Sequence, residues 1–207
     1  MAEKTPAACL DIGTGLPRSG RARRDHESTN PMYSYEYPHP AVTTDVVVFT
    51  IREGELAVLL IERGAEPERG RWAIPGGFID IDEDLETAAR RELREETGVD
   101  ARELEQLHTF GRPDRDPRER VITVAYITIL RAEEVSVRAA SDAADAAWFP
   151  IHDLPELAFD HREILALAHE CLRSRLADPA TVRRFLPMAF TPAQMKAARE
   201  AIVAASR

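Results

Sequence analysis

The sequence predicts an α/β protein in which helices pack against a mixed β-sheet. Unbroken runs of β-branched and aliphatic residues, AVTTDVVVFTI at 41–51 and LAVLLIERG at 56–64, are typical of strands covered on both faces. Stretches with helical periodicity occur at 84–97 and 161–176. Strands and helices therefore follow one another along a single chain.

The remaining elements follow from local signals. Residues 52–55, Arg-Glu-Gly-Glu, predict a turn between the first two strands, and WAIPGGFI at 72–79 predicts a short strand interrupted by a Gly-Gly turn. VITVAYITILRA at 121–132 predicts another strand, and AAWFPIHDLP at 146–155 a strand that leads into a turn. Asp82 or Asp84 would cap the helix at 84–97, Gly98 would end it, and Thr191 would cap a last helix from about Pro192.

The chain has 207 residues, of which 44% are apolar and 30% charged, as in a soluble globular protein. Residues 1–31 are polar and without period, which predicts a disordered leader. We expect the main domain at 32–177 and a helical tail at 178–207. No run of 18 apolar residues occurs, so no membrane span is expected. With only two cysteines, a reducing cytoplasm is the expected location.

The net charge of −9 is unevenly distributed. Residues 32–170 carry 15 basic and 30 acidic side chains, whereas 171–207 carry seven basic and two acidic ones. An acidic body disfavours nonspecific binding of nucleic acid and suits a protein that gathers divalent cations.

Three glutamates lie close together in the helix predicted at 84–97. On a helical wheel Glu92 and Glu96 fall inside the apolar stripe, and Glu95 falls on its margin. A solvated acidic face explains this poorly, because the opposite side of the helix is already charged. Arg91 can pair with Glu95, which leaves two buried carboxylates that need another cation. Oxygen ligands without His or Cys favour Mg²⁺ or Mn²⁺.

This stretch resembles the Nudix box. Gly77, five residues, Glu83, seven residues and RELREETGV at 91–99 match the motif at every position. The resemblance implies an α/β/α sandwich in which the box forms a loop, a helix and a loop. It implies that Glu92, Glu95 and Glu96 bind a divalent metal with a backbone carbonyl of the Gly76-Gly77 loop. Glu83 and Arg91 would orient these ligands, and water would attack a phosphorus of a nucleoside diphosphate linked to another group.

Further segments resemble bacterial ADP-ribose pyrophosphatases: YEYPHPAVTTD, RGRWAIPGGFID, FGRPDRDPRERVITVAYITIL and LAFDHREIL. The resemblance implies that ADP-ribose is cleaved to AMP and ribose 5-phosphate, and that the protein is a homodimer. Other nucleotide sugars, NADH or oxidised nucleotides are the alternative substrates.

Four arginines, Arg112, Arg115, Arg118 and Arg120, lie in one proline-interrupted loop, and their guanidinium groups suit phosphate recognition. Alternatively they pair with the loop's own acids, Asp114, Asp116 and Glu119; we expect Arg115 and Arg120 to meet substrate.

The general base stays open among Glu95, Glu119, Asp142 and Asp145.

Three other positions are open to more than one interpretation. His161 could reach the site or cap a helix beside Asp160. Trp72 could stack on a base, although core packing is the favoured interpretation, and Trp148 and Phe149 are predicted to lie in the core.

FLPMAFTPAQMKAAREAIV also resembles the start of the winged-helix region of Nudix-related transcriptional regulators of NAD metabolism. This resemblance implies a second possibility, a protein that senses ADP-ribose and binds DNA. The acidic body and the intact Nudix box favour the enzyme.

Overall fold

The computed structural model describes residues 36–134 and 143–204. The chain divides into two units, Met1–His39 and Pro40–Arg207. Residues 36–39 of the first unit are exposed and irregular, and all the helices and strands described here belong to the second. The predicted leader at 1–31 lies outside the described residues.

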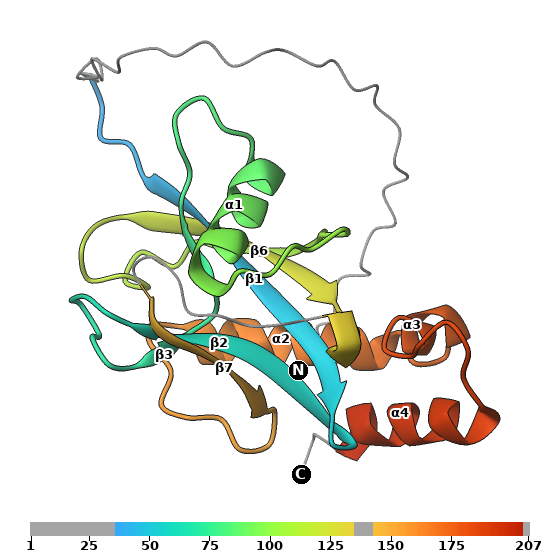
Figure 1. Ribbon diagram of the computed structural model, residues 1–207. Coiled ribbons are helices and arrows are strands. Elements are labelled where there is room, and N and C mark those ends of the chain that lie inside the picture. Colours follow the sequence, from blue (N-terminus) through green and yellow to red (C-terminus); the bar gives the residue numbers. More distant parts are fainter. Residues whose placement is uncertain (1–35, 135–142, 205–207) are drawn as a thin grey trace, which may run out of the picture. The chain divides into compact units, whose positions relative to one another are not determined.

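A mixed β-sheet forms the centre of the second unit (Figure 1). Its strands are β1 (Ala41–Arg52), β2 (Glu55–Arg63), β3 (Trp72–Ala73), β4 (Gly76–Phe78), β5 (Glu105–Phe110), β6 (Val121–Ile129) and β7 (Ala143–Pro150). The main order is β3-β2-β1-β6-β5, with β4 paired to β1 and β7 paired to β2. β1 and β6 are parallel, and the other pairs are antiparallel. The predicted mixed sheet is confirmed.

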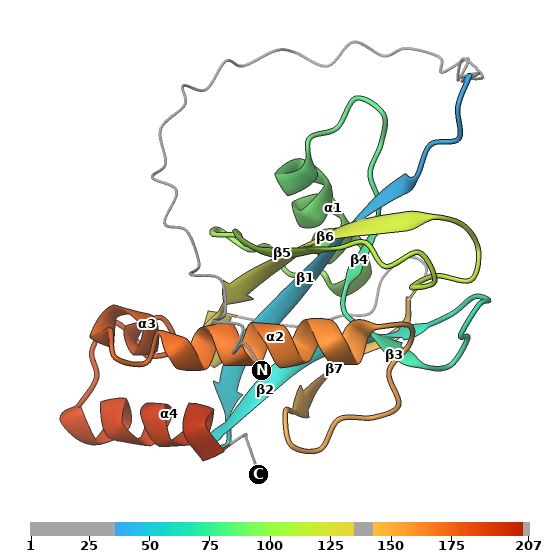
Figure 2. The same ribbon diagram turned by 180° about the vertical axis from the view of Figure 1, so that it is seen from behind.

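Helices cover both faces of this sheet. α1 (Leu85–Thr97) lies on one face, and α2 (His161–Ser174) crosses the other, as the two opposite views show (Figures 1 and 2). Alternation along β1 divides the core accordingly, because successive strand side chains point to opposite faces. Val46 and Val48 pack with Leu93 of α1, whereas Val47 and Phe49 pack with Ile164 of α2. The α/β/α sandwich implied by the resemblance is therefore observed.

The C-terminal segment adds α3 (Pro179–Arg183) and α4 (Pro192–Ala204). Val182 of α3 and Ile202 of α4 are fully buried in the same apolar cluster as Val47 and Phe49. The helical tail therefore shares the core of the sheet. Within the described residues, no helix is long and apolar enough to cross a membrane.

The ends of α1 follow the sequence signals. Asp84, one of the two predicted caps, accepts a hydrogen bond from the backbone N–H of Glu86 at 3.2 Å. Gly98 ends the helix in the left-handed region, with φ 71°, and its N–H donates to the carbonyl of Arg94. Thr191 caps α4 as predicted, since its Oγ1 accepts from the N–H of Gln194. These ends fix which side chains α1 turns toward the sheet.

The structure corrects three details of the predicted elements. β5, α3 and the 3₁₀ turn η1 (Ala132–Glu134) were not expected. The strand at 72–79 breaks at Ile74-Pro75 rather than at the glycines, which belong to β4 and pair with Thr44 and Asp45 of β1. β7 begins at Ala143, so Asp145 lies in the strand and not in the loop before it.

Candidate functional site

A cavity of about 400 Å³ opens beside β4 and α1. Its walls come from β1, the end of β2, the loop after it, β3 and β4, α1, the loop before β6 and the start of α2. The charged side chains that line it are Asp45, Arg63, Glu66, Asp80, Arg91, Glu92, Glu96, Arg115, Asp116 and Arg118. Cations and carboxylates therefore face the same space.

Glu92 and Glu96 line this cavity, whereas Glu95 does not. The side chain of Glu92 is 15% exposed and that of Glu95 is 51% exposed. Burial raises the pKa of Glu96 to about 8; the N–H of Gly76 opposes this rise, and the charges of Glu92 and Asp45 add to it. Burial also raises the pKa of Glu92, although Arg91 opposes the change. The helical wheel thus separated the two inner glutamates from the outer one correctly.

The Gly76-Gly77 pair of β4 closes against these carboxylates. The N–H of Gly76 donates to Oε2 of Glu96 at 2.8 Å. A Cβ atom on Gly77 would lie 2.6 Å from Cδ of Glu92, and a Cβ on Gly76 would lie 2.1 Å from the carbonyl oxygen of Thr44. Only glycine allows so close an approach at either position.

Arg91 organises the acidic side of the site. Its guanidinium donates to Glu83 at 2.8 Å and 3.0 Å, to Glu92 at 2.7 Å and to Glu95 at 3.2 Å. A further bond reaches the carbonyl of Phe78. Hydrogen bonding to Glu83 is the main reason why the pKa of Arg91 is raised and that of Glu83 lowered. Arg91 therefore orients Glu92, and it pairs with Glu95 as the sequence predicted.

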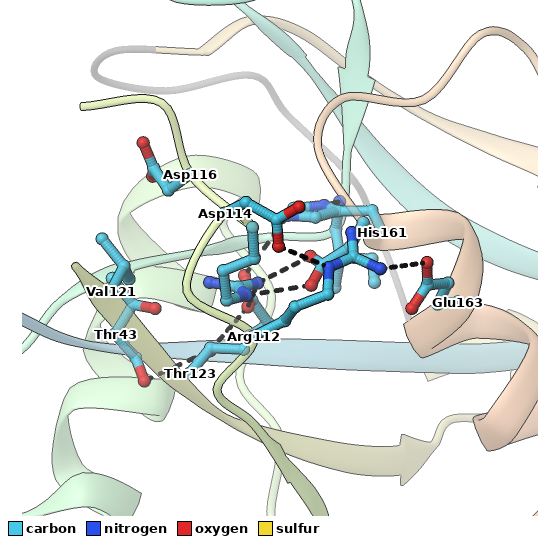
Figure 3. Close-up of polar contacts among 12 residues, drawn as sticks. Thr43, Arg112, Asp114, Asp116, Val121, Thr123, His161 and Glu163 are labelled. Carbon is cyan, nitrogen blue, oxygen red and sulfur yellow. Dashed lines mark hydrogen bonds and ion pairs between the residues drawn. The ribbon is translucent and has the colours of Figure 1, made fainter. Parts of the chain in front are cut away.

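The four arginines of the 111–120 loop separate into two groups. Arg115 and Arg118 line the cavity, whereas Arg112 and Arg120 do not. Arg112 is exposed and lies between Asp114 and Glu163, at 2.8 Å and 3.1 Å (Figure 3). Arg120 donates to the carbonyl of Val121 at 3.4 Å.

The two arginines at the cavity are themselves paired. Arg115 is buried and binds Asp160 through two hydrogen bonds of 2.8 Å and 2.9 Å. Arg118 holds Asp116 in the same two-pronged manner, with its shortest contact at 2.7 Å. The alternative in which loop acids bind the arginines thus applies to Arg112 and Arg118, but the partner of Arg115 comes from outside the loop.

His161 supports the cavity wall. It is buried at the start of α2, where its Nδ1 accepts the N–H of Ile74 at 2.9 Å and its Nε2 lies 3.9 Å from Asp45 (Figure 3). Burial lowers the pKa of His161, so the ring is neutral near pH 7. His161 therefore reaches the site, and it is not a helix cap. Asp160 makes no side-chain cap hydrogen bond either, since it binds Arg115.

The candidates for general base are dispersed. Glu119 and Asp145 are exposed and lie outside the cavity lining. Glu95 does not line the cavity either, but it is paired with Arg91, which does. Asp142 lies outside the described residues. Trp72 packs edge-on against Phe149 at 4.5 Å, outside the cavity lining, which favours its core interpretation. Phe149 and Trp148 are partly buried against the two core clusters, as predicted.

Sequence reasoning missed several lining residues. Asp45 carried a readable signal, a lone acid within an aliphatic strand; its Oδ2 accepts from Thr123 at 2.6 Å. Arg63 ends a strand and looks like any charged residue at a turn. Phe78 and Phe159 resemble ordinary apolar positions, although they lie at the cavity. No local pattern distinguishes these three residues from structural ones.

The chemistry of the site fits a divalent metal. In the described part of the chain, no three His, Cys, Asp or Glu side chains are arranged as a finished metal centre. Glu92 and Glu96 nevertheless place two partly buried carboxylates side by side. Within the part of the chain that the structure describes, the hydrogen-bond partner of Glu96 is a neutral group, the N–H of Gly76. A hard cation would stabilise both ionised forms. Cavity, carboxylates and arginines together have the chemistry that a metal-assisted reaction on a phosphate compound requires.

Comparison with known proteins gives the family. The family model of the NUDIX domain matches residues 40–168, more than half of the chain. The chain therefore belongs to the Nudix family. An ADP-ribose pyrophosphatase of Methanocaldococcus jannaschii is 40% identical over 62% of this chain and 73% of its own length. An ADPR-responsive transcriptional repressor, NtrR, of Acinetobacter baylyi is 32% identical over 81% of this chain and 68% of its own.

Solved structures agree with this assignment. A MutT/nudix family protein of Enterococcus faecalis has a TM-score of 0.75 at 31% identity and covers 83% of this chain and 77% of its own. The Nudix domain of Shewanella oneidensis NrtR, solved with ADP-ribose, has a TM-score of 0.63 at 35% identity and covers 68% of this chain and 94% of its own. Both an enzyme and a regulator are thus among the relatives.

Proposed function

We propose that this protein is a metal-dependent Nudix pyrophosphohydrolase that cleaves ADP-ribose to AMP and ribose 5-phosphate. The observation that carries the proposal is the pair Glu92 and Glu96, which faces Gly76 and Gly77 inside a cavity that also holds arginines. The likeness to an ADP-ribose pyrophosphatase over 73% of that enzyme supports the choice of substrate.

The metal would be held by carboxylates that other residues keep in position. Arg91 holds Glu92 in place, and the N–H of Gly76 holds Glu96. Both carboxylates, with the backbone carbonyl of Gly77 and with Glu95 at the margin, would hold Mg²⁺ or Mn²⁺. When bound, the ion supplies charge neutralisation of the diphosphate and activation of water. Hydrolysis adds one water across the P–O–P bond, so that each product keeps one phosphate.

The arginines would bind the substrate. Arg118 lines the cavity and is 38% exposed, so it can meet a phosphate directly. Arg115 lines the cavity too, but it is buried against Asp160 and supports the wall beside Asp45. Arg112 and Arg120, which lie outside the cavity lining, would contact substrate groups that extend beyond the cavity. An ionised carboxylate near the metal would accept the proton from water, and Glu95 is the candidate base that lies beside the metal-binding carboxylates.

A substrate panel tests the proposal. Purified protein with Mg²⁺ is given ADP-ribose, NADH, ADP-glucose and nucleoside triphosphates, and kcat/KM and products are measured for each. ADP-ribose should give the highest kcat/KM, with AMP and ribose 5-phosphate as products. A higher value for NADH, another nucleotide sugar or an oxidised nucleotide would replace the substrate while retaining the enzyme class.

A second candidate function is a regulator that senses ADP-ribose. The observation in its favour is the NtrR relative, whose match covers 81% of this chain and so extends beyond residues 40–168. A structure of Shewanella oneidensis NrtR with a 27-mer DNA also covers 79% of this chain at a TM-score of 0.68. The complete set of Nudix-box residues and the acidic body favour the enzyme. Binding of ADP-ribose without hydrolysis would favour the regulator.

We further infer a homodimer in the cytoplasm whose charge disfavours nucleic acid as a partner. The resemblance to homodimeric Nudix enzymes supports the dimer, and the small number of cysteines, two in the whole sequence, supports a reducing compartment. The 30 acidic against 15 basic side chains of residues 32–170 oppose attraction to phosphate backbones.

A further inference from the structure

Arg63, the last residue of β2, points its charge into the cavity. The pairing of β2 with β7 is irregular between Glu62 and Arg63, and such irregularities redirect a strand side chain. Nε of Arg63 donates to the carbonyl of Pro67 at 3.0 Å. Among the described residues, no hydrogen-bond partner is found for its two Nη atoms. Arg63 is therefore a half-buried cation with two donor groups available.

The aromatic ring of Phe159 contacts the guanidinium group of Arg63. The guanidinium carbon of Arg63 is 4.7 Å from the centre of the Phe159 ring, and that of Arg118 is 5.7 Å from the same ring. Both distances are within the range of cation–π contacts. Phe159 has a φ of 51°, a conformation unusual for a bulky side chain and often found at functional sites. The Phe159 ring is therefore in contact with both arginines.

Arg118 is fixed in its position. Asp116 binds it through Nε and Nη2, and its guanidinium also lies 5.2 Å from the Phe78 ring. Burial and then the nearby charge of Arg118 lower the pKa of Arg63, although the charges of Asp116, Glu96 and Glu68 oppose the change. A phosphate in contact with both guanidinium groups would further offset the repulsion between them.

We propose that Arg63, Phe159 and Arg118 form an arginine–phenylalanine clamp that binds a phosphate of the substrate's diphosphate group. The clamp holds that phosphate in the cavity that Glu92 and Glu96 also line, independently of the metal. Arg63 supplies two donors, Arg118 supplies Nη1, and Phe159 contacts both guanidinium groups. This assignment rests on the proposed function for the identity of the substrate, but not for the binding of the anion.

Calorimetric titration with inorganic pyrophosphate in EDTA tests the clamp on the full chain. Arg63→Gln should weaken binding about 10-fold, equivalent to about 1.4 kcal/mol. Arg69→Gln is the matched control, because Arg69 is exposed on the loop after β2 and outside the cavity lining. It should leave the dissociation constant within about twofold, since it removes the same charge without a donor in the cavity.

Phe159 provides a second pair of variants, which decides the question if Arg63→Gln does not fold. Phe159→Leu should weaken pyrophosphate binding, whereas Phe159→Tyr keeps the aromatic face and should bind like the wild type. Circular dichroism melts check that each variant is folded. Wild-type protein that binds no pyrophosphate, or Arg63→Gln that binds as well as Arg69→Gln, would overturn the clamp.

Hydrolysis of ADP-ribose with Mg²⁺, measured on the same preparations, separates the two proposals. If ADP-ribose is not cleaved but pyrophosphate binding depends on Arg63, the proposed function is wrong and the clamp stands. If ADP-ribose is cleaved and pyrophosphate binding ignores Arg63, the clamp is wrong and the function stands.

Discussion

Glu96 is a carboxyl group that burial makes costly to ionise in the absence of metal. It lies within a cavity wall, and burial raises its pKa to about 8 from an ordinary 4.5. Between these pH values the folded metal-free protein holds a proton that the unfolded chain has lost. The free energy of unfolding therefore falls as the pH rises from about 4.5 to about 8.

Glu96→Gln should remove this pH dependence, because an amide does not ionise. Urea unfolding in EDTA at about pH 5 and about pH 8 measures the effect. We expect the wild type to lose more stability than the variant over this interval. Equal losses for the two proteins would contradict the assignment of Glu96 as a carboxylate strained by burial.

Gly77 makes a sharper geometric prediction. A methyl group there would lie 2.6 Å from Cδ of Glu92, so Gly77→Ala must displace that carboxylate. We expect kcat to fall on the order of 100-fold, as is typical of small misplacements of a catalytic group. Gly111→Ala is the control, because its methyl group would meet nothing closer than 3.8 Å. Similar losses of activity in the two variants would show that the approach of Glu92 to Gly77 is unimportant.

At the scale of single residues, sequence predicted what depends on spacing and missed what depends on the meeting of distant segments. The Nudix spacing placed Glu92, Glu96 and Arg91 correctly at the cavity. Arg63 and Phe159 are 96 positions apart, and only the folded sheet and the start of α2 bring them together. Likewise, nothing near Arg115 in the sequence indicates Asp160 as its partner.

Among the elements, α1 is the one that joins the core to the site. Leu93 is completely buried, while Glu92 and Glu96 of the same helix line the cavity. The same helical periodicity therefore determines both packing and chemistry. This coupling explains why a helical wheel could distinguish the two inner glutamates, Glu92 and Glu96, from Glu95.

α4 tests whether the C-terminal helices belong to the domain. Ile202 is completely buried in the cluster that contains Val47 and Phe49, whereas its neighbour Val203 is 48% exposed. Ile202→Ala should reduce the free energy of unfolding by about 2–4 kcal/mol, as expected for loss of a buried aliphatic side chain. Val203→Ala should change it by less than about 0.5 kcal/mol. Thermal and urea unfolding of both variants provide the measurement.

An Ile202→Ala protein as stable as Val203→Ala would mean that α4 does not contribute to the core.

The elements that sequence missed have weaker patterns than α4. β5 alternates between exposed and half-buried residues at the edge of the sheet, and α3 is only five residues long. Neither carries enough apolar periodicity to be recognised before its neighbours are in place.

At the scale of the whole molecule, the predicted dimer is open to direct measurement. Sedimentation equilibrium should give about twice the chain mass of 23.1 kDa, if the assembly proposed from the family resemblance forms. A mass near that of one chain at all concentrations would remove the dimer from this account.

The charge distribution makes a prediction about nucleic acid. Binding to DNA without sequence preference should be weak at physiological salt, because the body of the protein carries twice as many acids as bases. Titration of labelled duplex DNA, followed by fluorescence anisotropy, measures it. Tight binding that ADP-ribose reverses would instead support the regulator.

Glu92 and Glu96 are proposed to hold the metal with which the protein cleaves ADP-ribose. The most direct measurement is the rate of AMP release from ADP-ribose by wild type and by Glu96→Gln across a titration of Mg²⁺ and Mn²⁺. We expect metal-dependent turnover by the wild type and a loss of at least about 100-fold in the variant, without loss of folding. Metal-independent turnover, or a variant as active as the wild type, would contradict it.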